Sequence, residues 1–309
     1  MARGGEPTLI FETVHGSTAF GLARDGSDVD LKGIVIGPPA WYLGWRGGPE
    51  QVDLSPDHVR YEIRKFVRLA AEANPTAIEM LFVGPQHHRT VTAAGQRLLD
   101  ARNEFVSKRV ADRFGRYALS QLKRIRTHRG WLLDPPRSAP TRAMFGLPER
   151  TVIPADQLAA AQTLVDAGDI AAADVSADFL DLLDREKRYK HAQAIWQRYN
   201  DWLRNRNPHR SAVEATFGFD TKHAMHLVRI QRMALEILTS GTVVVERPDR
   251  EELLAIRDGA WTYDELEART SELSDRIEAA ARSSGLPAEP DLDRLDALCT
   301  DLVREHLAC

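Results

Sequence analysis

Residues 11–36 read FETVHGSTAFGLARDGSDVDLKGIVI. An apolar run ends in a turn at Gly16 and Ser17; ten residues follow, and then Asp28 and Asp30 stand at the head of a second apolar run. This order predicts a strand, a short helix and a second strand. Because side chains alternate faces along a strand, we expect the two aspartates to point the same way and to share divalent metal ions.

The turn and the carboxylates suit different parts of one ligand. A Gly-Ser turn that opens a helix offers backbone N–H groups and a hydroxyl, which fit a phosphate. Metal-binding carboxylates beside it indicate metal-assisted attack on a nucleoside triphosphate. Each motif is common alone, and an Asp-x-Asp is more often a solvated turn, but their order and spacing favour a site. Val29, between the aspartates, is expected to face the core.

Length and composition are those of a water-soluble protein with two domains. The chain has 309 residues, of which 43% are hydrophobic and 28% charged. We find no apolar run of membrane-spanning length, and the N-terminus lacks the apolar segment of a signal peptide, so we expect no membrane partner and a cytoplasmic location. Two cysteines form no zinc framework, so any metal should bind carboxylates or histidines.

Charge is distributed unevenly although the net charge is only −4. Residues 102–130 carry nine Lys and Arg against two acids, and residues 185–210 carry eight against two. From residue 249 to the end, sixteen acids face seven arginines. The middle of the chain is therefore basic and its tail acidic. The two basic segments are candidates for binding a nucleic acid.

Glu62 is the candidate for a third carboxylate. Residues 57–75, DHVRYEIRKFVRLAAEANP, predict a short strand that runs into a helix. Two-metal phosphoryl transfer uses a further acid to orient or deprotonate the attacking hydroxyl, and a neighbouring strand can supply it. The alternative makes Glu62 a residue that complements the dipole of the helix that follows. Asp57 is the second choice for the acid.

The remaining chain reads as largely helical. Residues 93–130 have basic amphipathic periodicity, 134–154 are a breaker-rich loop, and 155–180 predict one or two plain helices whose role we do not assign. Residues 179–208 interleave Arg and Lys with aromatic residues, which suits an RNA-facing surface, although the helical spacing of several rings favours a core role. VVVERP at 243–248 predicts a short strand, and the acidic tail predicts charged helices without an assigned role.

A second chemical element lies in residues 218–241, GFDTKHAMHLVRIQRMALEILTSG, which predict a helix of about five turns. At about 100° per residue, Lys222, His226 and Arg229 share one stripe, and His223 flanks it. Their partner is either the triphosphate held by the N-terminal region or a set of protein carboxylates, and we favour the phosphate. A zinc site here lacks a third ligand.

Several segments together resemble the polymerase beta-like nucleotidyltransferases of the RNA repair type, called RlaP. They are HGSTAFGLARDGSDVDLKGI, YEIRKFVRLAAEANPTAIEMLF, RNPHRSAVEATFGFDTKHAMHLVR and GTVVVERPDREELLAIRDG. The resemblance implies an α+β fold, in which a catalytic domain with a small mixed sheet, residues 1–92, precedes a mainly helical domain, residues 93–309, that closes over the nucleotide. It also implies two magnesium ions, for which manganese is an alternative.

The resemblance carries residue roles with it. Gly16 and Ser17 match the phosphate-binding turn, Asp28 and Asp30 the metal ligands, and Glu62 the third acidic and metal-binding position. The segment KHAMHLVR matches as well, and its helical stripe suggests that it faces the nucleotide. Its four residues are Lys222, His223, His226 and Arg229.

These patterns predict transfer of a nucleoside monophosphate from a triphosphate to a hydroxyl, with release of pyrophosphate. The expected acceptor is an RNA 3′ end, because of the two basic segments. The alternatives are a small-molecule or protein hydroxyl and a non-catalytic nucleotide- or RNA-binding module. The preferred nucleotide, template dependence and oligomeric state are not encoded in any pattern that we can identify.

Overall fold

One five-stranded mixed sheet organises the N-terminal part of the computed structural model, which describes residues 5–151, 159–161, 163–164, 167, 177–206 and 208–308. Its strand order is β3-β4-β2-β1-β5. The β2–β4 pair is parallel and the other pairs are antiparallel. The strands are β1 (Thr8–His15), β2 (Asp30–Ile36), β3 (Gln51–Ser55), β4 (His58–Glu62) and β5 (His88–Val91).

The strand, short helix and second strand expected from residues 11–36 are confirmed. The four-residue helix α1 (Gly16–Ala19) joins β1 to the loop that leads into β2. The two strands pair antiparallel, and His15 stands opposite Asp30. The last residue before the turn and the first of the returning strand are therefore neighbours across the sheet.

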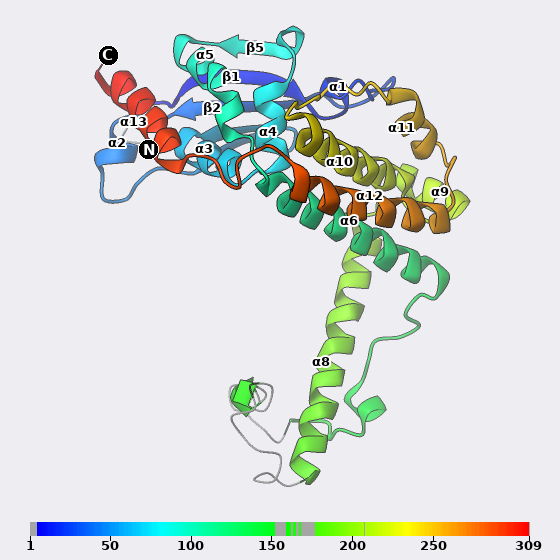
Figure 1. The fold of residues 1–309 in the computed structure, drawn as a ribbon. Coiled ribbons are helices and arrows are strands. Elements are labelled where there is room, and N and C mark those ends of the chain that lie inside the picture. Colours follow the sequence, from blue (N-terminus) through cyan, green and yellow to red (C-terminus); the bar gives the residue numbers. More distant parts are fainter. Residues whose placement is uncertain are drawn as a thin grey trace. The chain divides into compact units, whose positions relative to one another are not determined.

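Helices α3 (Ile63–Ala71) and α4 (Pro75–Phe82) pack against the sheet (Figure 1). The buried side chains of β1 and β2, such as Phe11 and Ile34, join those of both helices in one apolar core. Helix α4 begins as its sequence predicts: the Asn74 side chain accepts a hydrogen bond from the Ala77 N–H, and Pro75 takes the first helical position. These caps fix where α4 crosses the sheet.

The remaining helices follow the expected order. Helix α10 begins at its N-cap Asp220 and ends at Gly241, whose φ of 70° suits a glycine. It packs against α11 and α12 in the same core. The further helices are α2 (Ala40–Leu43), α5 (Ala93–Asp100), α6 (Arg109–Leu133), α8 (Ala177–Arg204), α9 (Pro208–Phe217), α10 (Thr221–Ser240), α11 (Arg250–Arg257), α12 (Tyr263–Ser283) and α13 (Leu292–Ala308), with short 3-10 turns η1 (Pro85–His87), η2 (Arg102–Phe105) and η3 (Arg142–Phe145).

The chain divides into two compact units. Unit 1 comprises residues 1–126 and 219–309, and unit 2 comprises residues 127–218. Unit 1 thus joins the sheet to the C-terminal helices. The division at residue 92 expected from the sequence separates a catalytic from a binding domain. The two units found here are defined by packing, so the expected division of roles stays a prediction.

Two local expectations are wrong or lie outside the described structure. Residues 243–248 form no strand and run as irregular backbone, in which the Arg247 N–H donates to the Phe20 carbonyl. The segment follows the edge of α1 instead of a sheet edge, so no ladder forms. Most of the helices expected over 155–180 fall outside the described residues. Among the residues that the structure does describe, no helix combines the length and apolar character needed to cross a membrane.

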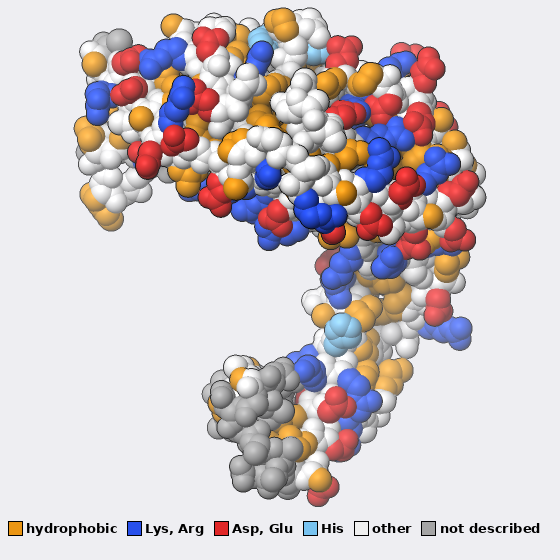
Figure 2. Space-filling view, in the orientation of Figure 1, with side chains coloured by type: hydrophobic (Ala, Val, Ile, Leu, Met, Phe, Trp, Pro, Cys, Tyr) orange, Lys and Arg blue, Asp and Glu red, His pale blue; other side chains and the backbone are white. Residues whose placement is uncertain are grey.

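The acidic tail pairs with the basic middle of the chain. Arg109 contacts Glu289 at 2.8 Å and Arg126 contacts Glu267 at 2.7 Å, while Glu104 receives Arg294 at 2.7 Å. Figure 2 accordingly shows positive and negative side chains interspersed over the visible face of unit 1. Part of the positive charge of residues 102–130 is thus matched by carboxylates of the chain itself, which weakens this segment as an RNA-binding surface.

Candidate functional site

The Gly16 turn lies directly against the Asp30 carboxylate. A Cβ built on Gly16 would stand 1.9 Å from Asp30 Oδ2, and the backbone there has a φ of +65°. Both facts require glycine, because a side chain would overlap the carboxylate and the left-handed backbone would be strained. Ser17 follows in the same turn and is half-buried. The structure therefore brings together three of the predicted residues, namely Gly16, Ser17 and Asp30.

Asp28 lies just before the first residue of β2. It is exposed, whereas Asp30 is half-buried. Val29 between them is 54% exposed, which contradicts its expected place in the core. The strand begins only at Asp30, so the alternation of faces does not extend back to Val29. Both aspartates remain accessible to a ligand, as a metal site requires.

Glu62 stands at the other end of the sheet from Asp30. In the parallel β2–β4 pair it aligns with Val35, five positions beyond Asp30, which corresponds to roughly 16 Å along a strand. The odd offset also places Glu62 on the opposite face. The expected grouping of Glu62 with the two aspartates is therefore not found.

Glu62 is instead a buried helix cap whose polar partners lie closer to the surface. Its side chain accepts a hydrogen bond from the Arg64 N–H at the start of α3 and another from the Tyr42 hydroxyl at 3.0 Å. The residue is 2% exposed. Burial raises the pKa of Tyr42, and the adjacent Glu62 carboxylate raises it further, so this hydroxyl stays a donor. The helix-start interpretation of Glu62 is the one that the structure supports.

Asp57 is the acid whose backbone lies beside the start of β2. The Leu31 N–H donates to the Asp57 carbonyl at 2.7 Å, and Leu31 aligns with His58 in the β2–β4 register. The Asp57 side chain is exposed, in the turn between β3 and β4. No group of three or more His, Cys, Asp or Glu side chains in the described parts of the chain is arranged to hold a metal ion. Magnesium is commonly held by one or two protein carboxylates plus substrate phosphates, so the donors at Asp28 and Asp30 fit it.

A buried ionic chain connects this turn to α10. Glu79 on α4 has its Oε2 3.2 Å from His15 Nε2 and its Oε1 2.6 Å from Arg229 Nη1. The guanidinium carbon of Arg229 also lies 3.7 Å from the centre of the Phe20 ring. All of these side chains are buried. Burial alone opposes ionisation of Glu79, but the charges of Arg229 and His15 lower its pKa to about 2.

Arg229 is thus paired with a protein carboxylate, which is the alternative considered for the stripe of cationic residues on α10. The carboxylate belongs to Glu79 on α4 and not to the acidic tail. Its ion pair does not point it at a ligand. Arg229 reaches the candidate site only through Glu79 and His15, the residue that precedes Gly16. Its role in this structure is to hold α10 against the turn.

The other predicted residues of α10 lie near its first turn. His223 Nδ1 is 2.6 Å from Asp220 Oδ2, and Asp220 also accepts the His223 N–H as the N-cap. Lys222 is half-buried. Burial, together with the positive charges of Arg229 and Lys222, lowers the pKa of His226 to about 3, so its ring is neutral at pH 7. Lys222 is therefore the cation among these three residues that is suited to attract a phosphate.

Glu79 is a buried link that the local sequence does not reveal, because its helix TAIEMLF offers no charge partner within one turn. A carboxylate surrounded by apolar residues on a short helix is the one signal that pointed to burial, and a buried carboxylate needs a cation. The identity of that cation, Arg229, 150 positions away, has no local signal.

One of three comparisons with known proteins gives a match. A family model described as RlaP, RNA repair pathway DNA polymerase beta family, matches residues 2–132. Over these residues the resemblance to polymerase beta-like nucleotidyltransferases is confirmed, and the matched part contains the turn, both aspartates and Glu79. No curated protein and no solved structure matches the chain.

Proposed function

We propose that the protein transfers a nucleoside monophosphate from a nucleoside triphosphate to an acceptor hydroxyl and releases pyrophosphate. The observation that carries the proposal is the contact between the Gly16 turn and the Asp30 carboxylate, which would put a phosphate cradle beside a metal ligand. The match of residues 2–132 to a polymerase beta family supports the same chemistry.

The residues divide the work as follows. Gly16 and Ser17 would hold the terminal phosphates, and the half-buried Lys222 would add positive charge as the leaving group departs. Asp28 and Asp30 would hold magnesium, which supplies charge neutralisation on the phosphates when it is bound. Asp57, in place of Glu62, would be the third acid, because its backbone carbonyl accepts a hydrogen bond from the Leu31 N–H next to Asp30.

In the reaction, the acceptor oxygen forms a bond to the α-phosphorus as the bond between the α-phosphorus and the bridging oxygen breaks. The electron pair of the broken bond leaves with pyrophosphate. The hydroxyl proton passes to the Asp57 carboxylate or to water, since an exposed carboxylate at this edge can accept it.

RNA is the acceptor that the chain favours. In unit 2, the rings of His128 and Trp202 lie 5.4 Å apart, and Tyr199 and Trp131 pack against the same group. Arg206 stacks on Trp202 at 4.4 Å. Half-buried aromatic rings with an arginine are able to stack bases, and the description of the matching family names an RNA repair pathway. Transfer to a small molecule or a protein is the alternative.

The test is incubation of the purified protein with magnesium, each labelled nucleoside triphosphate in turn, and a pool of small RNAs. The control is the double variant Asp28→Ala, Asp30→Ala. Label in RNA with the wild type only would support the proposal. Pyrophosphate release that requires cell extract would favour another acceptor. If nucleotide binds but neither product forms, the protein is a binding module under these conditions.

A further inference from the structure

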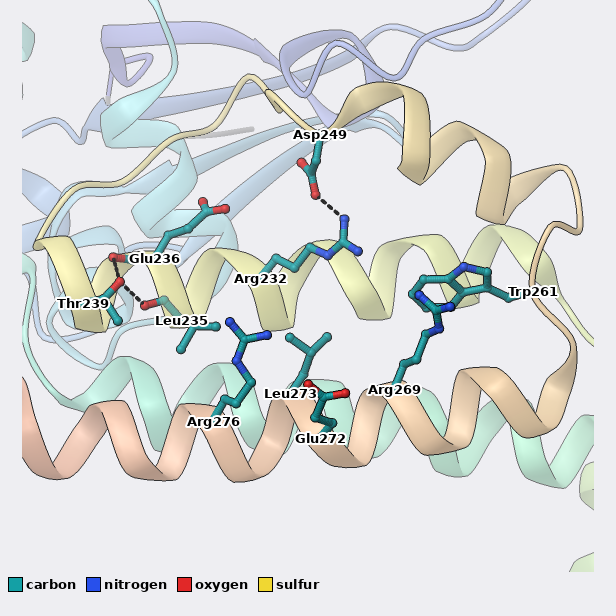
Figure 3. A pocket seen from close by; sticks show the side chains of 10 residues that line it. All are labelled: Arg232, Leu235, Glu236, Thr239, Asp249, Trp261, Arg269, Glu272, Leu273 and Arg276. Carbon is teal, nitrogen blue, oxygen red and sulfur yellow. Dashed lines mark hydrogen bonds and ion pairs between the residues drawn. The ribbon is translucent and has the colours of Figure 1, made fainter.

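A second cavity lies away from the Gly16 turn, between α10, α12 and the chain that leads to Trp261. Its volume is about 600 Å³, which suits a mononucleotide-sized ligand. Figure 3 shows Arg232 on α10 facing this space and Arg269 and Arg276 rising into it from α12. Three arginines thus line one hollow.

Two of the lining carboxylates are already neutralised. Glu236 binds the buried Arg247 through two hydrogen bonds of 2.6 and 2.7 Å. Asp249 is shared between Arg247 at 2.8 Å and Arg232 at 2.7 Å. These ion pairs fix the wall of the cavity and leave little negative charge to repel an anion.

Arg269 and Arg276 differ from Arg232, because no carboxylate of the described residues lies within ion-pair distance of either. Arg269 is held by its contact with Trp261, whose ring centre lies 4.5 Å from the guanidinium carbon. The stacking orients Arg269 and leaves its N–H donors for hydrogen bonds. Seven residues, about two helical turns or roughly 10 Å, separate the two arginines along α12.

Glu272 lies between the two arginines on α12, and it is the remaining charged residue of the lining. The uncommitted side chains therefore carry two positive charges against one negative charge. Both guanidinium groups are exposed, and although Glu252 and Glu265 act on Arg269 electrostatically, neither forms a close ion pair with it. Guanidinium groups placed in this way in a concave site are suited to bidentate binding of phosphate oxygens.

We propose that this cavity binds the polyphosphate chain of a mononucleotide-sized ligand through Arg269 and Arg276. The ligand class is a di- or triphosphate, either free or as part of a nucleotide. The site is separate from the Gly16 turn and requires no metal ion, so it stands whether or not the protein is a nucleotidyltransferase.

The test is isothermal titration calorimetry with inorganic pyrophosphate and, separately, ATP, in EDTA to remove any metal-dependent binding. We expect the double variant Arg269→Gln, Arg276→Gln to lose at least tenfold in affinity for both probes. Glu272→Gln should bind them severalfold more tightly, because it removes the one uncommitted negative charge. Arg282→Gln, on the same helix outside the cavity, is the matched control and should bind as the wild type does.

Two further measurements distinguish this cavity from the site at the Gly16 turn and from an RNA-binding surface. Asp28→Asn, Asp30→Asn should keep the wild-type affinity in EDTA, and loss of binding there would overturn the proposal. Equal binding by the wild type and the double arginine variant would also overturn it. So would a result in which a single-stranded oligoribonucleotide depends on Arg269 and Arg276 but pyrophosphate and ATP do not. Circular dichroism of each variant checks that it is folded.

Discussion

The two ends of the β2–β4 strand pair carry acidic residues of the same type in opposite surroundings. At one end Asp30 lies half-buried against the Gly16 turn, next to the exposed Asp28. At the other, Glu62 is buried as a helix cap with Tyr42 and Arg64 as partners. A carboxylate that is to bind a ligand keeps free lone pairs, whereas one that holds the fold has them occupied. Substitutions at the Asp30 end should therefore change activity more than stability, and substitutions at the Glu62 end should change stability more than activity.

The largest effect is expected at the open end. We predict that Asp30→Asn lowers nucleotide incorporation by at least about a hundredfold, the scale for removal of one electrostatic contact to the transition state. The free energy of unfolding should change by no more than about 1 kcal/mol, the central value for a point mutation, because Asp30 is only half-buried. Incorporation assays and urea denaturation measure the two quantities. A large loss of stability at unchanged activity would mean that Asp30 supports the fold and not the reaction.

The buried chain that supports this end should be sensitive to the loss of its carboxylate. Glu79→Gln leaves Arg229 buried without a countercharge, so we expect the free energy of unfolding to fall by roughly 3–5 kcal/mol. Urea denaturation at pH 7 checks this. Glu79→Gln combined with Arg229→Met should recover part of the loss, because both charges are then absent. If the single variant is as stable as the wild type, the ion pair does not hold α10 against the turn.

Acid should weaken the fold in two steps. The pKa of His226 is lowered to about 3, so the unfolded chain binds more protons between about pH 6.5 and 3, and stability falls as the pH drops through this window. Glu79, with its pKa lowered to about 2, contributes stability that is present above about pH 4.5 and lost toward pH 2.

Thermal unfolding of the wild type and of His226→Asn, measured across pH 3–7, tests the first step. The variant should show a flatter profile above pH 4.5. Parallel profiles for the two proteins would mean that folding does not lower the pKa of His226.

At the closed end, Glu62→Ala should cost about 2 kcal/mol of stability, because the cap of α3 is lost and the Tyr42 hydroxyl loses its acceptor. Incorporation per folded molecule should stay within about twofold of the wild type, unlike that of Asp30→Asn. Denaturation and activity at matched folded fractions measure both. A hundredfold loss of activity would mean that Glu62 takes part in the reaction, as the sequence predicted.

The loss of stability expected at Gly16 is smaller than those expected at Glu79 and Glu62. Gly16→Ala places a methyl group on a backbone with φ of +65°, so we expect a loss of about 1–2 kcal/mol. Because the methyl group displaces the Asp30 carboxylate, magnesium-dependent nucleotide binding should weaken as well, by an amount that titration calorimetry measures. Gly26→Ala, whose φ of +76° is similar but whose Cβ meets nothing within 4 Å, is the matched control. Equal nucleotide binding by both variants would mean that the contact between Gly16 and the Asp30 carboxylate does not matter for nucleotide binding.

The sequence by itself determined the local elements. The Gly-Ser turn with two flanking apolar runs specified strand, helix and strand, because turns depend on residues only a few positions apart. The helix expected in residues 218–241 rests on similarly local signals and is found as α10. Asp30 opens the second strand and Asp28 precedes it, while their sharing of a metal site stays a prediction.

The tertiary structure alone decided which distant charges meet. The register of β4 against β2 placed Glu62 at the far end of the sheet and the Asp57 backbone beside the start of β2, and that register is set by the pairing of two strands that are not consecutive in the chain. The pairing of Glu79 with Arg229, and of the acidic tail with the basic middle, likewise joins segments separated by more than a hundred residues. Such pairs form because the apolar faces of the helices fix where each element lies, and the charges are then neutralised by whichever partners the packing brings within reach.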